Sequence, residues 1–172
     1  RATEMPASAF AVVDLAGRAA ASASDESFER NAWWLVARTS LRHAWDVREG
    51  DLTPARWATL GKAVAWGRSR ERLFRLGRMV GGDPSRGGIY GFSAFEEGAG
   101  VLALRNPSAE PATIERTLSS LLWLSRAASK KTYRLTGVFG ETRPLEGSRQ
   151  GRSIVKVELP PFAVGIVEAK EE

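Results

Sequence analysis

The sequence contains no cysteine and a single histidine, His43. Without cysteine the chain can form no disulfide, no cysteine-ligated zinc or iron–sulfur centre and no thiol nucleophile. One imidazole excludes a multi-histidine metal site and leaves a serine triad only one residue to serve as its base. Apolar residues also never run for the roughly 18 positions that a bilayer-spanning helix needs. We therefore expect no metal, no bound cofactor and no membrane partner.

Arginine is the residue that the chain has in excess. Its 25 basic residues outnumber its 20 acidic residues, which gives a net charge of +5 at pH 7. Two interpretations of a local run of arginines stay open: a basic face for nucleic acid, or cations gathered at a helix C-terminus, where the macrodipole favours them. We favour the helix C-terminus, because the helix in question is easy to identify. The run consists of Arg68, Arg70, Arg72, Arg75 and Arg78.

The first part of the chain shows strand and helix signals in alternation. A continuous apolar run at about 9–15 is typical of a strand buried in a parallel sheet. Ser24 and the acids that follow it predict a helix at about 25–42. Trp33 and Trp34 lie side by side in this helix and are expected to pack in a core rather than on a sugar.

A second helix is predicted at about 54–75. Thr53 is a good N-cap, and Pro54 falls at the first helical position, where its missing N–H costs nothing. Residues 1–80 are therefore interpreted as one or two β/α units.

From residue 81 onward the pattern changes to an all-β one. A glycine-rich turn passage comes first, and alternation with period two follows. Short strands, frequent turns and few helical signals predict an antiparallel β-sandwich over 81–172, with a surface loop at 141–152 and a charged tail at 168–172. The expected strands are 89–95, 101–104, 132–139, 154–159 and 162–168.

Two candidate chemical motifs carry little weight. The passage 81–88 superficially suggests a phosphate loop, but it lacks the Lys-Ser/Thr ending and leads into a strand instead of a helix. Asp14 interrupts the first apolar run near the end of its strand, where barrel enzymes keep their chemistry. It has no evident second carboxylate, and glycoside hydrolysis needs two.

Several short motifs follow one another along the second predicted helix and the turns and strands after it: Trp57 and Trp66, then Gly81-Gly82-Asp83-Pro84, Tyr90-Gly91 and Arg105-Asn106-Pro107. Their order resembles the C-terminal region of bacterial glycoside hydrolases related to the α-galactosidases. The resemblance runs over 31–168 and departs from the pattern at Phe95, where a tryptophan is expected. It implies an α+β chain in two parts: a β/α remnant of a (β/α)8 barrel over 1–80 and an antiparallel β-sandwich over 81–172. The residues that carry it, which we expect to be structural, are Trp57, Trp66, Gly81, Gly82, Asp83, Pro84, Tyr90, Gly91, Arg105, Asn106 and Pro107.

The resemblance also implies where catalysis does not occur. In such enzymes the catalytic aspartates lie on earlier barrel strands, so this chain is expected to hold no catalytic residue. Its sandwich would buttress a barrel formed by preceding polypeptide, its expected partner. Two alternatives stay open: a sandwich that binds carbohydrate, and an arginine-rich module that binds nucleic acid, whose affinity would fall steeply with salt.

The two parts are expected to differ in stability. Proteolysis should release an all-β fragment of about 83–169. Residues 1–78 should be marginal alone, because helix faces bearing tryptophans would form an exposed apolar patch. Those residues are Trp33, Trp34, Trp57 and Trp66.

Overall fold

The computed structural model describes residues 11–14, 24–39, 42–45, 50 and 52–172. β1 and β2 pair in parallel, and α2 lies between them along the chain, so the first elements follow a β–α–β–α order. These elements are β1 (Ala11–Asp14), α2 (Asp25–Ala37), β2 (Arg42–Trp45), α3 (Pro54–Arg68) and the single turn α4 (Glu71–Phe74).

Both long helices begin where their capping residues predict. Ser24 Oγ accepts a hydrogen bond from the Ser27 amide at 3.1 Å, ahead of α2. Thr53 Oγ1 accepts one from the Arg56 amide at 3.3 Å, and Pro54 opens α3. Each cap satisfies one of the amides that a helix start leaves without an intrahelical partner.

Both helices end earlier than the sequence predicts. Helix α2 stops at Ala37 instead of about 42, because Thr39 takes a positive φ of 58° and β2 follows. Helix α3 stops at Arg68, and α4 is a separate turn, so the expected single helix at 54–75 is two. Between the long helices the structure has the strand β2, for which the sequence offered no separate signal.

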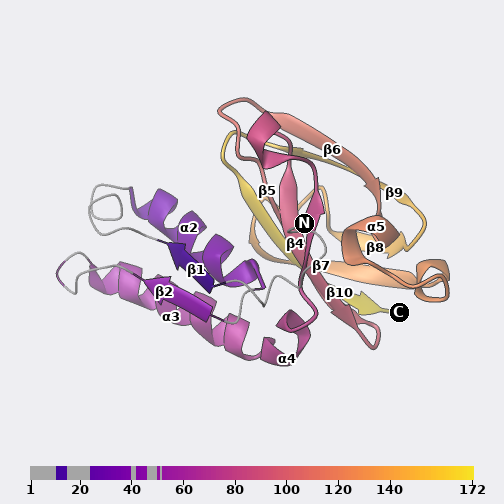
Figure 1. The fold of residues 1–172 in the computed structure, drawn as a ribbon, viewed down its shortest axis with the longest axis horizontal. Helices are drawn as coiled ribbons and strands as arrows, with labels where there is room; N and C mark the ends of the chain where they lie inside the picture. The colour runs from indigo at the N-terminus through magenta and orange to yellow at the C-terminus, as the bar shows by residue number, and fades with distance from the viewer. Residues whose placement is uncertain (1–10, 15–23, 40–41, 46–49, 51) are drawn as a thin grey trace.

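Residues 78–172 form two antiparallel sheets, which we call the two-sheet region (Figure 1). The first is six-stranded, with the order β3-β4-β5-β10-β7-β8, and the second pairs β6 with β9. The strands are β3 (Arg78–Gly81), β4 (Tyr90–Glu96), β5 (Ala99–Arg105), β6 (Ala112–Thr117), β7 (Thr132–Gly140), β8 (Gly147–Gln150), β9 (Ile154–Leu159) and β10 (Val164–Glu171).

One apolar core fills the space between the two sheets. Leu102 and Leu104 of β5 enter it from the large sheet, and Val157 and Leu159 of β9 enter it from the small one. The short helix α5 (Leu118–Leu122) contributes leucines to the same core. In β5, β7, β9 and β10 alternate residues face this core, as the period of two requires.

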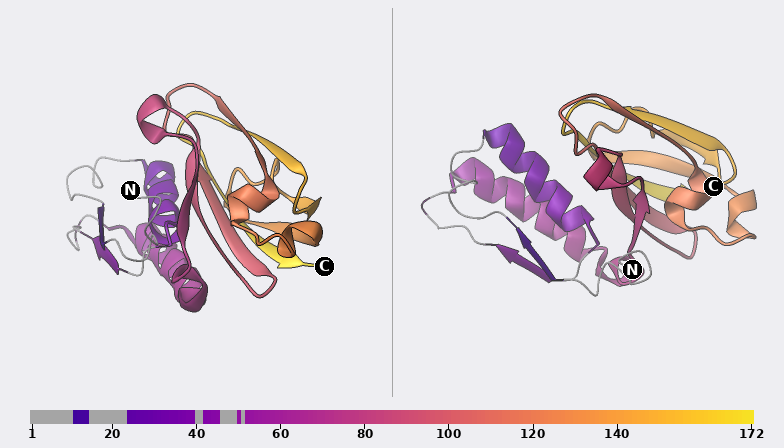
Figure 2. Two further views of the ribbon diagram at one scale, coloured as in Figure 1. Left: turned by 45° about the vertical axis from the view of Figure 1, so that its right-hand side comes forward. Right: turned by 45° about the horizontal axis from the view of Figure 1, so that its top comes forward.

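A second core joins the helices to the outer face of the six-stranded sheet. Trp34 and Val36 of α2 and Ala63 of α3 share it with Ala103 of β5 and Ile166 of β10. We call α2, α3 and α4 the helical layer. In Figure 2, left, the helices lie between the β1–β2 pair and the two-sheet region.

The predicted strands agree with the structure to different degrees. The strand expected at 154–159 has those bounds as β9, and the hairpin expected around 96–100 turns at Glu97 and Gly98, which both have positive φ. The expected loop at 141–152 contains β8, and the expected charged tail at 168–172 belongs largely to β10. The sheet begins at Arg78, slightly before the expected boundary at 81.

The chain is thus α+β, with mostly antiparallel sheet and few helices. Within the described residues, no helix has the length and apolar character to cross a membrane.

Candidate functional site

The motif residues Gly81 and Gly82 form a tight turn after β3. Gly81 has a φ of 94°, and a Cβ there would lie 2.7 Å from the Ile89 carbonyl oxygen. The Gly82 amide donates to the same carbonyl at 2.6 Å. Only glycine fits this close approach, so the pair serves the chain reversal between β3 and β4.

Asp83 and Pro84 complete this turn. The Asp83 carboxylate accepts hydrogen bonds from the Ser85 hydroxyl at 2.7 Å and from the Ser85 amide at 2.9 Å. These two bonds, the hydroxyl first, lower the pKa of Asp83. Pro84 opens a short 3-10 turn that ends at Arg86, and β4 follows. The hydrogen bonds of this passage stay within the turn, which fits a structural role and not a phosphate site.

Asn106 ties three segments of the two-sheet region together. Its side chain is fully buried, and its amide oxygen accepts from the Ser108 amide at 2.9 Å. Such a buried side chain is retained only when its polar atoms are satisfied. Its amide nitrogen donates to the carbonyl oxygens of Glu110, Leu159 and Pro160 at 2.8, 3.0 and 2.9 Å.

Tyr90, Gly91 and Arg105 lie where the sheet meets the helical layer. The Tyr90 ring meets Trp34 of α2 edge-on with centroids 5.4 Å apart, and the Arg105 guanidinium lies 5.7 Å over the Trp34 ring. A Cβ on Gly91 would lie 1.9 Å from the Ala103 carbonyl oxygen, so only glycine fits there. Pro107 follows in the half-buried loop after β5.

The two motif tryptophans of α3 have different surroundings. Trp66 Nε1 donates to Glu168 of β10 at 2.7 Å, and Arg70 forms an ion pair with the same carboxylate. Trp66 therefore links α3 to the sheet. Trp57, near the start of α3, is 51% exposed.

The arginine run after α3 is largely neutralised by nearby acids. Arg70 pairs with Glu168, Arg72 contacts Glu96 at 3.2 Å and Arg75 contacts Glu71 at 3.3 Å. Because each of these cations faces a carboxylate, the run offers little free positive charge to a phosphate backbone. Arg78 differs, since its guanidinium lies over the Trp123 ring.

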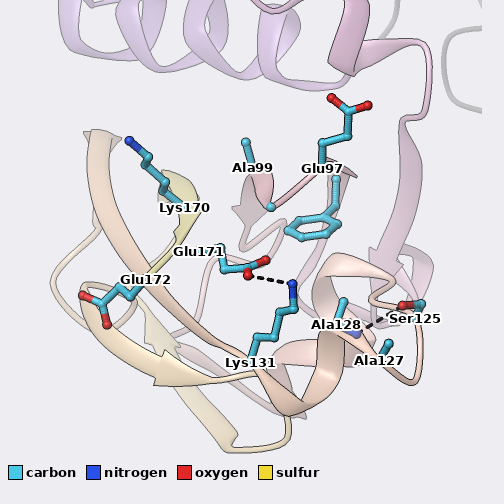
Figure 3. A pocket seen from close by; sticks show the side chains of 11 residues that line it. Glu97, Ala99, Ser125, Ala127, Ala128, Lys131, Lys170, Glu171 and Glu172 are labelled. Carbon is cyan, nitrogen blue, oxygen red and sulfur yellow. Dashed lines mark hydrogen bonds and ion pairs between the residues drawn. The ribbon is translucent and has the colours of Figure 1, made fainter.

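A groove opens at the end of the six-stranded sheet, beside the β4–β5 turn (Figure 3). Its volume is about 740 Å³, and its walls come from that turn, from the segment around Ala128 and from the end of β10. Figure 3 shows Lys131 and Glu171 pointing toward each other, and their charged atoms are 2.7 Å apart. Lys170 and Glu172 also line the groove.

Two titratable side chains, Lys131 in the groove and Tyr133 behind it, are held in their protonated forms. The hydrogen bond to Glu171 raises the pKa of Lys131, which keeps the amine protonated. Burial, before the charge of Glu171, raises the pKa of Tyr133, whose hydroxyl donates to the Ala128 carbonyl at 2.8 Å. An ammonium serves poorly as a base or nucleophile, and the Tyr133 ring is buried with its hydroxyl already bonded, so neither group favours acid–base catalysis.

The described residues also contain no group of three or more carboxylate or imidazole side chains placed to hold a metal. Asp14 ends β1 and His43 lies in β2, but their side chains are outside what the structure describes. Among the motif residues, Gly81 to Pro84 form a turn, Asn106 joins segments of the two-sheet region, and Tyr90, Arg105 and Trp66 contact the neighbouring layer, whereas Trp57 is exposed.

Comparisons with known proteins find similarity in structure and not in sequence. No protein-family model matches the chain, and no curated protein matches it. A Bacillus halodurans protein provisionally described as an alpha-N-acetylgalactosaminidase superimposes with a TM-score of 0.56 at 14% identity, over 86% of this chain and 32% of that one. Alpha-galactosidase I from Mortierella vinacea also gives 0.56, at 10% identity, over 83% and 35%.

The alpha-galactosidase from Saccharomyces cerevisiae gives a TM-score of 0.55 at 10% identity, over 86% of this chain and 44% of that one. In all three cases the chain spans less than half of the larger structure. At such identities the likeness concerns the fold. The fold of this chain is therefore similar to part of the fold of α-galactosidases and related glycoside hydrolases.

Proposed function

We propose that the chain is the C-terminal, non-catalytic portion of a glycoside hydrolase, in which a β-sandwich formed by the two-sheet region buttresses a catalytic barrel. The observation that carries the proposal is the second core, through which α2 and α3 pack on the outer face of the six-stranded sheet. An interface of this kind fixes the sheet to whatever larger body contains the helices.

The β1–β2 pair supports the idea that this larger body is a barrel. Two parallel strands with a helix between them are the repeating unit of a (β/α)8 barrel. Parallel sheets occur almost only when several strands are covered on both faces, so a pair alone is incomplete. In the proposal, β1 and β2 are the last two barrel strands, and preceding polypeptide supplies the others.

Aromatic contacts make the join between helices and sheet stiff. Trp33 stacks on Phe139 of β7 with centroids 5.2 Å apart and planes inclined by 10°. Trp33 also contacts Trp66 at 5.7 Å, and Trp66 is bonded to Glu168. Close-packed aromatic clusters move as a unit, so the sandwich would hold the final barrel helices in a fixed orientation.

The substrate class in this proposal follows the solved structures of similar fold, which include α-galactosidases. α-Galactosides are accordingly the first substrates to test. In the proposal hydrolysis rests on the barrel, and the groove, with its Lys131–Glu171 ion pair, contributes charged contacts.

The test compares the chain alone with a longer polypeptide encoded together with the sequence that precedes it. We expect the chain alone to release no p-nitrophenol from aryl α-galactosides or aryl N-acetyl-α-galactosaminides, and the longer polypeptide to hydrolyse one of them. Trp34→Ala in the longer polypeptide should shorten its half-life at elevated temperature, because it weakens the join. Hydrolysis by the chain alone that Asp14→Asn abolishes would overturn the proposal.

A further inference from the structure

Trp123 points outward between residues that point inward. Leu121 and Leu122, at the end of α5, are buried in the core between the sheets, and Leu124 packs against that core. Trp123 is 51% exposed. Most other tryptophans of the described region lie in aromatic clusters, so this indole stands apart.

The backbone at Trp123 is left-handed, a conformation that favours glycine over a bulky side chain. Its φ of 53° and ψ of 42° place it in the left-handed region, where helix ends usually carry glycine. Its amide donates to the Ser119 carbonyl and closes the helix, which any residue can do. Neither the turn nor the core therefore accounts for a large aromatic side chain at this position. Strained residues of this kind cluster at functional sites.

Arg78 supplies a cation beside the exposed ring. Its guanidinium carbon lies 4.9 Å from the centroid of the Trp123 ring, within the range of a cation–π contact. Arg70 and Arg72 each face a carboxylate, whereas in the described part of the chain no carboxylate lies within ion-pair distance of Arg78. Arg78 is also exposed, so its guanidinium can donate hydrogen bonds to a ligand beside the ring.

We propose that Trp123 and Arg78 form a surface platform that binds a pyranose ring of a carbohydrate chain. The apolar C–H face of a sugar ring would stack on the exposed indole, and the guanidinium would donate hydrogen bonds to neighbouring hydroxyls. The choice of carbohydrate over another flat ligand rests on the proposed function. An open platform, unlike a closed pocket, suits a polymer that passes over the surface.

The test measures mobility of the chain in native gels cast with and without galactomannan, a neutral polysaccharide with galactose side chains. A neutral polymer excludes retention by the positive charge of the chain. We expect galactomannan to retard the chain, and Trp123→Gly to abolish that retardation. Glycine suits the left-handed backbone, so this variant should keep or raise the melting temperature, which separates loss of binding from loss of folding.

Trp57→Ala is the matched control, because Trp57 is also 51% exposed but lies on α3. It should leave the retardation unchanged, while Arg78→Ala should weaken it. The proposal is overturned if galactomannan does not retard the chain, if Trp123→Gly has no effect, or if the platform instead binds single-stranded DNA in a Trp123-dependent way. Because no hydrolysis is measured, these results are independent of the activity test of the proposed function.

Discussion

The two-sheet region and the helical layer are stabilised in different ways. In the two-sheet region every described strand has a hydrogen-bonded partner, and apolar side chains of both sheets meet in one core. Within the described residues, the helices share a small cluster of their own, around Phe28 and Leu60. Their larger apolar face is buried against the sheet. Among the described side chains, the helical layer therefore buries most of its apolar surface against the sheet.

The exposed surfaces of the two regions differ as well. Of the tryptophans expected to form an exposed patch when residues 1–78 stand alone, Trp34 is buried and Trp33 and Trp66 pack against the sheet in the full chain, so the patch in the isolated part stays a prediction. Trp57 of α3 is exposed even in the full chain. A helix with apolar residues on two faces suits a position between two bodies, of which the sheet is one.

The largest effect is expected from Trp34→Ala, which cuts the contact between the regions. Trp34 is 2% exposed and touches Tyr90 and Phe92, so its loss should cost about 3–5 kcal/mol of unfolding free energy. If the helical layer depends on the sheet, its helical circular dichroism signal should be lost at lower urea than the β signal. Trp57→Ala, the control, should change stability by about 0.5 kcal/mol or less. If Trp34→Ala unfolds in a single transition at the same urea concentration as the parent chain, the helical layer does not depend on the sheet in this way.

Asn106→Ala tests how much the buried hydrogen bonds of Asn106 stabilise the two-sheet region. It removes the Asn106 donor from the buried Leu159 carbonyl and from the part-buried carbonyls of Glu110 and Pro160, and a buried group left unsatisfied costs about 1–3 kcal/mol. We expect a loss of about 3 kcal/mol in urea unfolding, with both signals shifting together. Ser108→Ala removes only an exposed hydrogen bond to the Glu110 amide, so it should cost about 1 kcal/mol or less. Equal effects of the two substitutions would argue against a special role for Asn106.

Two glycine-to-alanine substitutions, one in each region, should change the free energy of unfolding in opposite directions. Gly91→Ala places a Cβ 1.9 Å from the Ala103 carbonyl oxygen inside the sheet, and such overpacking costs about 1–3 kcal/mol. Gly61→Ala meets open space on α3 and should gain about 1 kcal/mol, since alanine is the better helix former. Thermal unfolding of both variants measures the contrast. A loss for Gly61→Ala would show that something covers the outer face of α3.

The smallest effect is expected on stability at alkaline pH, where Tyr133 and Lys131 titrate. Burial raises the pKa of Tyr133 above its ordinary value of 10.0, and Glu171 raises the pKa of Lys131 above 10.5. A raised pKa means that the protonated form is favoured in the folded chain, so this stability is complete below those values and is lost as pH rises through the folded pKa values. The melting temperature should fall less above pH 10.0 in Tyr133→Phe than in the parent chain. Identical pH profiles would exclude this contribution.

Local signals in the sequence predicted several elements well. Thr53 and Pro54 located the start of α3, and Ser24 located the start of α2, because a cap and its helix are neighbours in the chain. The bounds of β9 followed from its alternation, and the turn at Glu97 and Gly98 from its glycine. The absence of cysteine and the single histidine likewise needed no structure to interpret.

The sequence predicted a structural role for the motif at 105–107 but did not identify the residues that it contacts. That Asn106 binds the carbonyls of Leu159 and Pro160 depends on residues more than 50 positions away, which no local pattern identifies. The same holds for Trp123, which is exposed at a left-handed backbone position. In the sequence it is one more apolar residue within an apolar run.

What the sequence by itself determined are the features set by neighbours along the chain: helix starts, tight turns, the alternation of the longer strands and the excess of arginine. Only the tertiary structure decided that β2 pairs with β1, that β8 forms inside a polar loop and that the helices cover the sheet. These features depend on backbone pairing and apolar burial between distant segments, and their free energy appears only when the segments meet.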